Sequence, residues 1–238
     1  MIEERVAEGA KGQLTAGIAK QDNLVLRAVE FIYNKLSEWR DDPNRPQEES
    51  EPKLNPLLAK FLNSRARVGF TMVQFTHEEP QTGRSRGDLS VSPTEAVMIF
   101  ARVFTVYDPF LVIECKRLPA PSKKREREYL TGGDNRTGGV QRFKLGLYAP
   151  KEENAVLIGY IQSNDSKYWH EMILSWMKEL AGANRQSDGT DWGNDECLEP
   201  LYSASNRSAR WLSRHSRTGS VSVSDISIHH LWIEMTSP

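Results

Sequence analysis

The chain has 238 residues, of which 38% are hydrophobic, so it is long enough to bury a sizeable core. Its formal net charge is −1, so no overall basicity indicates a nucleic acid or a membrane surface as partner. Two distant cysteines indicate neither a disulfide framework nor a zinc site, and no apolar run approaches the roughly 20 residues of a membrane span. We expect a soluble, cytoplasmic protein of one domain.

Two helices are predicted before the first strand. Residues 21–39 place apolar side chains at steps of three and four, which forms one face of an amphipathic helix. A proline-rich acidic connection follows. The second helix is expected near residues 55–67, where Asn55 can cap and Pro56 suits the first turn. We interpret residues 1–50 as an N-terminal helical extension.

Strands are predicted next. From Val68 the hydrophobic pattern has a period of two, which indicates a strand, a turn in EEPQTGRSRG and a return strand near Asp88. The stretch SPTEAVMIFARVFTVYDP combines the capping-box spacing of a helix with the alternation of a strand, and we favour the strand. The apolar strand FLVIECKRL comes directly after it.

The second half of the chain alternates helices and strands. A basic loop rich in glycine and proline leads to a short helix in VQRFKLGLY and a buried strand in NAVLIGYIQ. A third helix is expected in YWHEMILSWMKELA, an acidic loop in NRQSDGTDWGNDECLEP, and two late strands in SARWLSRHS and SDISIHHLWIEM. This succession predicts an α/β fold with a central mixed sheet flanked by helices.

Glu114 and Lys116 come at the end of an apolar strand. Residues two apart share one face of a strand, so these two side chains emerge together while Cys115 points the other way. The spacing alone is weak evidence, because a Glu-x-Lys triplet occurs by chance about once in a chain of this length. The alternative interpretation is an ion pair on the surface of the sheet.

Three features together resemble the PD-(D/E)XK nuclease superfamily, which has the restriction-endonuclease-like fold. The triplet ends an apolar strand, Asp88 precedes it at a glycine-bounded strand start, and a helix in GGVQRFKLGLYA follows it. The resemblance covers about residues 50–162 and implies a metal-dependent phosphodiesterase site at Asp88, Glu114 and Lys116. Gly87 stands where the family name has a proline.

The long gap between Asp88 and Glu114 implies an extra hairpin, and Asp108 in YDPF is the alternative partner, although it is better explained as a turn residue. The resemblance implies that Asp88 and Glu114 bind Mg²⁺, for which Mn²⁺ can substitute, and that Lys116 orients the attacking water. Physical chemistry agrees, since two carboxylates about 4 Å apart repel by roughly 4 kcal/mol at an effective dielectric constant of about 20. A hard divalent cation relieves that repulsion.

The resemblance implies further members of the site. The family often adds an acidic residue from the helix before the first core strand, and we assign that role to Glu51, with Glu48 and Glu49 as rivals. The helix after the motif frequently supplies a Gln or a basic residue to the phosphate. In this chain the corresponding residues are Gln141 and Arg142.

Local charge supports a polyanionic substrate. Residues 116–144 contain nine basic and three acidic residues, a local net charge of +6. A solvated charged loop explains the run of KKRERE equally well. The residues that we expect to bind nucleic acid are Lys123, Lys124, Arg125, Arg136, Arg142 and Lys144.

The sequence thus predicts a Mg²⁺-dependent nuclease that hydrolyses DNA phosphodiester bonds, with RNA as the other substrate to consider. A role in restriction or defence against foreign DNA, a homodimer and a partner protein for targeting are expectations by analogy alone. The alternative is a non-catalytic nucleic-acid-binding or assembly module that keeps the fold. Within the single domain we place the catalytic core at residues 51–165, with the helix and strands of residues 166–238 completing it.

Overall fold

The computed structural model describes residues 19–20, 23–81, 86–183, 189–205, 207–218 and 225–236. Parts of four predicted segments lie outside these residues: residues 1–18 and 21–22 at the N-terminus, residues 82–85 of the turn, residues 184–188 of the acidic loop, and Ser224 at the start of the last predicted strand.

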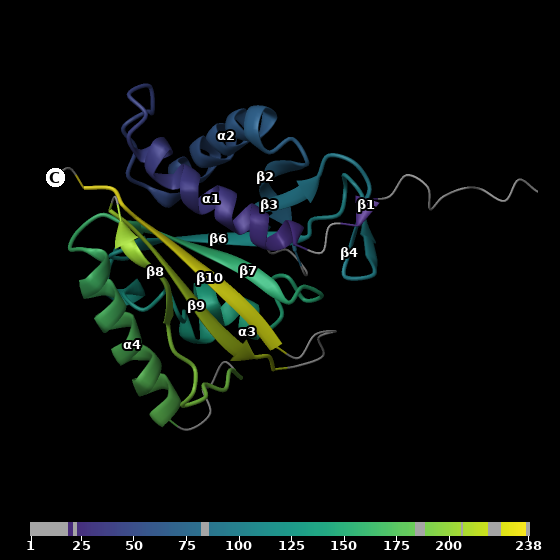
Figure 1. The fold of residues 1–238 in the computed structure, drawn as a ribbon. Coiled ribbons are helices and arrows are strands. Elements are labelled where there is room, and N and C mark those ends of the chain that lie inside the picture. The colour runs from purple at the N-terminus through teal and green to yellow at the C-terminus, as the bar shows by residue number, and fades with distance from the viewer. Residues whose placement is uncertain are drawn as a thin grey trace, which may run out of the picture.

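A mixed sheet of seven strands forms the centre of the described structure (Figure 1). β6, β7 and β10 are parallel to one another, and every other neighbouring pair is antiparallel. The α/β class and the mixed central sheet are therefore confirmed. In spatial order the strands are β2 (Val73–Pro80), β3 (Arg86–Pro93), β6 (Leu111–Leu118), β7 (Asn154–Ile161), β10 (Asp225–Glu234), β9 (Ser208–Ser216) and β8 (Glu199–Ser205).

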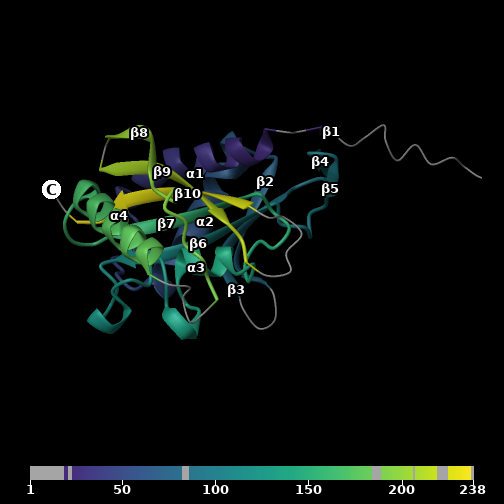
Figure 2. The ribbon, with the colours of Figure 1, turned by 90° about the horizontal axis from the view of Figure 1, so that it is seen from below.

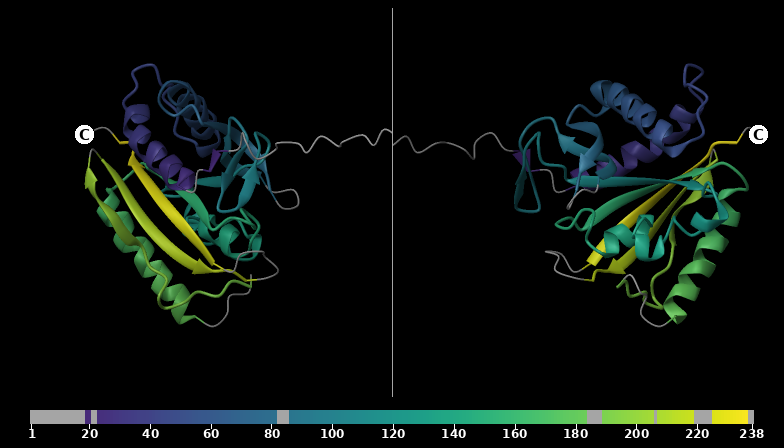
Figure 3. Two further views of the ribbon diagram at one scale, coloured as in Figure 1. Left: turned by 45° about the vertical axis from the view of Figure 1, so that its right-hand side comes forward. Right: turned by 180° about the vertical axis from the view of Figure 1, so that it is seen from behind.

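Helices cover both faces of this sheet (Figures 2 and 3). α1 (Leu24–Arg40) and α2 (Glu51–Gly69) lie on one face, and α3 (Gly139–Lys144) and α4 (Ser166–Gly182) lie on the other. The alternation within β6 serves both layers, because Ile113 and Cys115 pack toward α1 and α2 whereas Val112 and Leu118 pack toward α3 and α4. No helix among the described residues is both long and apolar enough to cross a membrane.

A small second sheet includes the two strands that lie between β3 and β6 in the sequence. It contains β1 (Ala19–Lys20), β4 (Val97–Ile99) and β5 (Arg102–Phe104). The two-residue turn between β4 and β5 requires positive φ at both positions, and Phe100 and Ala101 have φ of 46° and 63°. The hairpin implied by the distance between Asp88 and Glu114 is therefore present.

Several boundaries differ from the prediction. α2 begins at Glu51, because Ser50 is its N-cap and Pro52, rather than Pro56, lies in its first turn. Asn55 is not a cap, since it is buried and accepts a hydrogen bond from the Tyr160 hydroxyl at 3.1 Å. α2 continues through Gly69, so the first core strand starts at Val73, and β8 was not predicted.

Candidate active site

β3 and β6 separate at the point where the predicted site residues lie. Their ladder joins Leu89–Val91 to Leu111–Ile113 and forms no further pair among residues 86–88 and 114–118, all of which the structure describes. On its other side β6 pairs with β7 as far as Leu118. The second half of β6 therefore has a backbone edge that no described strand covers.

Two carboxylates bind this free edge instead. The backbone N–H of Cys115 donates to Asp88 Oδ2 at 2.8 Å, and the backbone N–H of Arg117 donates to Glu51 Oε2 at 3.3 Å. Buried N–H groups need partners, so the carboxylates replace the carbonyl groups of a neighbouring strand. This arrangement brings the start of β3 and the first residue of α2 to the same stretch of β6.

Glu114 and Lys116 lie on the face of β6 that α3 covers. Glu114 Oε1 is 2.8 Å from Lys116 Nζ and 2.6 Å from Arg142 Nη1, and the Glu114 side chain is 0% exposed. Lys116 Nζ is also 3.5 Å from Glu51 Oε1. Glu114 Oε2 is buried and has no hydrogen-bond partner. The cluster therefore contains one buried carboxylate oxygen that is not used.

The charges in the cluster perturb one another. Burial raises the pKa of Asp88 well above its usual range, and the nearby Glu114 carboxylate raises this pKa further. Burial also raises the pKa of Glu51. The positive charge of Lys116 lowers this pKa, but by less than burial raises it. Burial disfavours the charged form of Lys116, but Glu114, Glu51 and Asp88 outweigh it and raise the pKa of the lysine. Lys116 therefore stays charged beside carboxylates that repel one another.

These residues fit a hard divalent cation in their chemistry. Glu114 has a buried oxygen without a partner, and Asp88 lies near enough to be repelled by it. Mg²⁺ typically binds one or two carboxylates together with water and phosphate oxygens. In the described part of the chain, however, no group of three or more His, Cys, Asp or Glu side chains is arranged to hold a metal ion. Lys116 and Arg142 contact Glu114 in this arrangement.

The rivals that the sequence left open lie elsewhere. Glu48 forms an ion pair with Lys53 at 2.9 Å, and Glu49 is exposed. Asp108 is also exposed, and it accepts hydrogen bonds from the backbone and the hydroxyl of Thr105, which closes a turn. Among the acidic candidates, the structure therefore brings Glu51 and Asp88 to Glu114 and Lys116.

Gln141 does not point to the cluster. Its Oε1 accepts hydrogen bonds from the backbone N–H groups of Gly132 at 2.9 Å and Gly138 at 3.0 Å. Its Nε2 donates to the carbonyl of Gly133 at 2.8 Å, and the residue is completely buried. The predicted contact with a phosphate is corrected, because this side chain holds the loop that leads into α3.

The predicted nucleic-acid-binding residues divide into two groups. Lys123, Lys124 and Arg125 are exposed and line a pocket of about 390 Å³ beside Gly132 and Gly133. Arg125 also pairs with Glu128 at 2.5 Å, and Arg136 is exposed nearby in the sequence. Lys144, in contrast, is completely buried and pairs with Glu196, so the prediction that it contacts phosphate is corrected.

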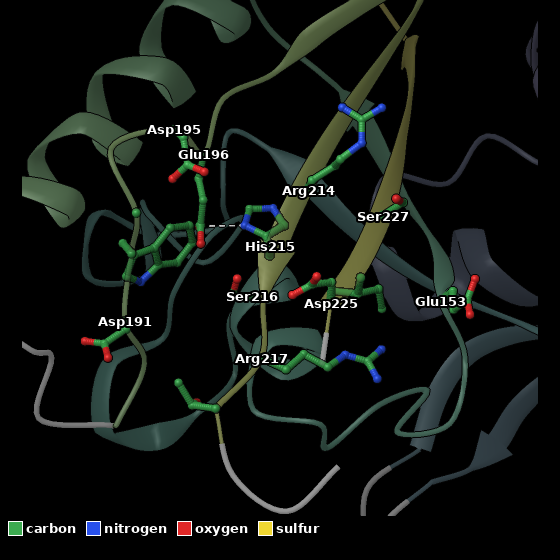
Figure 4. A pocket seen from close by; sticks show the side chains of 14 residues that line it. Glu153, Asp191, Asp195, Glu196, Arg214, His215, Ser216, Arg217, Asp225 and Ser227 are labelled. Atoms are coloured by element: carbon green, nitrogen blue, oxygen red, sulfur yellow. Dashed lines mark hydrogen bonds and ion pairs between the residues drawn. The ribbon is translucent and has the colours of Figure 1, made fainter. Parts of the chain in front are cut away.

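Lys144 belongs to a second buried polar cluster, which we call the histidine chain. Figure 4 shows part of it, where His215 and Glu196 are joined by a hydrogen bond and both line a cavity of about 740 Å³. The cavity lies against β9, β10 and the loop that contains Trp192. Hydrogen bonds link the members of the histidine chain in the order Lys144, Glu196, His215, Ser213, His230, Tyr129 and Trp232.

Tyr148 is a neighbour of the candidate site that the sequence did not indicate. Its hydroxyl donates to the carbonyl of Arg86, two residues before Asp88, and its ring centroid lies 4.9 Å from the Arg142 guanidinium. Burial raises the pKa of Tyr148, and the Glu114 charge raises it further. No spacing or motif in the sequence marks this residue, because its role depends on contacts with β3 and α3.

Comparisons of the chain with models of protein families, with curated proteins and with solved structures find no match. The geometry itself defines what the site can do. Carboxylates at this position could hold a divalent cation, which would supply polarisation of a phosphoryl oxygen and a lower pKa for a bound water. A lysine that stays charged beside them can offset negative charge that develops during reaction.

Proposed function

We propose that the protein is a Mg²⁺-dependent nuclease with a restriction-endonuclease-like core, which hydrolyses DNA phosphodiester bonds. The observation that carries this proposal is the separation of β3 from β6, where Asp88, Glu114 and Lys116 meet and one Glu114 oxygen is buried without a partner. The order of α2, β2, β3, β6 and α3 also supports it, because the resemblance implies motif residues on neighbouring strands between two helices.

The roles follow from the contacts. Asp88 and Glu114 would hold Mg²⁺ or Mn²⁺, and the bound ion would polarise the phosphate and acidify a water molecule. Lys116 has three N–H donors, of which two are directed to Glu114 and Glu51, so one remains for a water or a phosphate oxygen. Glu51 keeps Lys116 in place and protonated, because its carboxylate lies 3.5 Å from the ammonium group.

The exposed basic residues supply affinity for the phosphate backbone. Lys123, Lys124 and Arg125 precede the Gly132–Gly138 loop, and this loop leads into α3 beside Glu114. Binding through such residues releases counterions and weakens as salt increases. RNA shares the phosphodiester chemistry and is the other substrate to be tested.

A second candidate function is nucleic-acid binding without cleavage. The observation in its favour is that Lys116 and Arg142 both pair with Glu114, which makes the cluster a set of buried ion pairs. A binding module needs no divalent ion, because Arg and Lys side chains contact phosphate directly. Metal dependence therefore separates the two candidates.

The experiment is cleavage of plasmid and linear DNA with Mg²⁺, Mn²⁺ or EDTA. We expect cutting only with a divalent ion, and a loss of at least about 100-fold in Glu114→Gln and in Lys116→Ala. Glu95→Gln, which changes an exposed carboxylate outside the cluster, is the matched control and should cut like the wild type. If the wild type cuts neither DNA nor RNA with either ion and binds DNA equally well in EDTA, the second candidate is favoured.

A further inference from the structure

Arg142 connects the buried carboxylate with the surface. Its Nη1 lies 2.6 Å from Glu114 Oε1, yet its side chain is 23% exposed whereas that of Glu114 is 0% exposed. The Tyr148 ring, with its centroid 4.9 Å from the guanidinium, supports it from one side. Arg142 is therefore the more exposed of the two cations that contact Glu114, because the Lys116 side chain is 6% exposed.

We propose that Arg142 neutralises Glu114 in the metal-free protein and that a divalent cation displaces it toward the phosphate of the substrate. This inference rests on the proposed function and adds a role for Arg142. A buried carboxylate needs a compensating charge, and removing its partner without replacement is strongly unfavourable. Arg142 supplies that charge until the metal does.

The charge balance explains why Arg142 should move and Lys116 should stay. The carboxyl groups of Asp88, Glu114 and Glu51 share the cluster with two cationic side chains, Lys116 and Arg142. A divalent ion adds two positive charges, so it competes directly with a cation already on Glu114 Oε1. Lys116 is held by two carboxylates, those of Glu51 and Glu114. Among the described residues, the ion pair of Arg142 is with Glu114.

A released guanidinium is well suited to the substrate. Arginine binds phosphate oxygens in a bidentate geometry, and its planar group can remain stacked on the Tyr148 ring while its direction changes. Metal binding would then create a phosphate contact that the metal-free protein lacks. By linkage, phosphate binding would favour metal binding by the same factor.

The test measures metal and duplex binding separately. Mn²⁺ binding without DNA is followed by calorimetry or by electron paramagnetic resonance for the wild type, Arg142→Gln, Glu114→Gln and Arg136→Gln. Arg142→Gln removes the competitor and should bind Mn²⁺ about tenfold more tightly, which corresponds to the loss of one charge-assisted pair. Glu114→Gln should lose this binding. Arg136→Gln is the control: it changes an exposed side chain outside the cluster, so its Mn²⁺ affinity should match that of the wild type.

Duplex binding in EDTA gives the complementary result. Arg142 is engaged with Glu114 in the metal-free protein, so Arg142→Gln should change the duplex affinity by less than about twofold, whereas Arg136→Gln should weaken it severalfold. Arg142→Lys keeps the charge and should stay close to the wild type in Mn²⁺ affinity. It also keeps the test decisive if Arg142→Gln does not fold.

The outcomes separate this inference from the proposed function. Two outcomes would overturn the inference and leave the nuclease proposal intact. In the first, Mn²⁺ binding depends on Glu114 but is no tighter in Arg142→Gln than in the wild type. In the second, the Mn²⁺ affinity of Arg142→Gln is nearer to that of the wild type than the affinity of Arg142→Lys is. No Mn²⁺ binding in either the wild type or Arg142→Gln would overturn both. Tighter Mn²⁺ binding in Arg142→Gln, with wild-type affinity in Arg142→Lys and Arg136→Gln, supports the displacement of Arg142 by the ion.

Discussion

Two buried polar clusters lie on the same face of the central sheet, and they differ in how completely their polar atoms are paired. Glu114 on β6 and His230 on β10 are both in register with Leu157 on the intervening β7. Around Glu114, one carboxylate oxygen is buried without a partner. Around His230, the histidine chain pairs every buried side-chain nitrogen and oxygen of its members.

With both histidines neutral, one arrangement of protons satisfies every hydrogen bond of the histidine chain. The Trp232 N–H donates to Tyr129, and the Glu196 carboxylate accepts from His215 Nδ1 at 2.6 Å. The bonds between these ends are 2.7 to 2.8 Å long, and burial lowers the pKa of both histidines; with both neutral, Ser213 donates to His215 and accepts from His230. Such a completed network fixes a unique packing of the core.

The difference between the clusters separates stability from function. A network in which every polar group is paired contributes to folding, whereas a buried charge cluster with an unused oxygen costs stability and is retained where a ligand completes it. Substitutions in the two clusters should therefore have opposite consequences for unfolding and for activity.

The largest expected effect is that of Asp88→Asn on cleavage. Asparagine can still accept the Cys115 N–H but does not supply a charge to a metal, so we expect cleavage to fall at least about 100-fold. The free energy of unfolding at neutral pH should rise, because burial and the Glu114 charge raise the pKa of Asp88 and so disfavour its ionised form in the folded protein. Cleavage assays and urea unfolding measure the two quantities.

Glu95→Gln, at an exposed carboxylate outside both the candidate site and the histidine chain, is the control for this substitution and should change neither quantity. A clear loss of stability in Asp88→Asn would show that Asp88 has a structural role like that of the histidine chain.

Ser213→Ala should have the reverse effect. It removes the hydroxyl that joins His215 and His230, so two buried ring nitrogens lose their partner and the free energy of unfolding should fall by about 2 kcal/mol. Cleavage per folded molecule should be unchanged. Ser216→Ala lies on the same strand at an exposed position and should leave urea unfolding unaffected. A cleavage defect in folded Ser213→Ala would connect the two clusters functionally.

The pH dependence of stability should also distinguish the clusters. Burial lowers the pKa of His215 and lowers that of His230 well below its usual range, although Glu196 opposes the shift of His215. The unfolded chain therefore binds more protons than the folded chain below pH of about 6.5, and stability falls as the pH decreases, by up to about 1.4 kcal/mol per pH unit for each histidine. His229, whose pKa burial lowers to about 4, adds to this slope.

The carboxylates of the candidate site act in the opposite sense. Asp88 and Glu51 have raised pKa values, so the folded protein binds their protons at a higher pH than the unfolded chain does, and stability is gained as the pH falls. Urea unfolding between pH 7.5 and 5.5 of His215→Gln and the wild type isolates the histidine term, because the carboxylate term is common to both. An identical slope in the two proteins would contradict the neutral histidine chain.

The sequence was informative where a residue's role follows from its own strand. The alternation in FLVIECKRL placed Glu114 and Lys116 on one face, and SARWLSRHS corresponds to β9 at both ends. The order of motifs also brought Asp88 to the strand beside Glu114. The start of α2 was misplaced because two prolines offered alternative first turns, and β8 was missed because it is an edge strand whose first two residues belong to the predicted acidic loop.

The sequence was not informative where a partner comes from a distant segment. Gln141 was assigned to the phosphate because of its place in α3, but three backbone groups of the preceding loop bind its amide. Lys144 was counted with the basic surface, but it forms a buried ion pair with Glu196, which lies 52 residues away in the sequence. Local charge cannot reveal such pairs, since they form only when the sheet and its loops are assembled.

The smallest predicted effect tests this division of the basic residues. Lys123→Gln and Lys124→Gln each remove an exposed charge, so each should weaken duplex binding a few-fold and reduce the slope of log affinity against log salt by about one. Lys144→Gln should leave that slope unchanged and lower the free energy of unfolding instead, because it removes one of the two ion-pair partners that Glu196 has in the described part of the chain, the other being His215. Fluorescence anisotropy of a labelled duplex in EDTA over a series of salt concentrations measures the slope. If Lys144→Gln reduced it as much as Lys123→Gln does, Lys144 would contact the nucleic acid, and the assignment of this lysine to the histidine chain would be wrong.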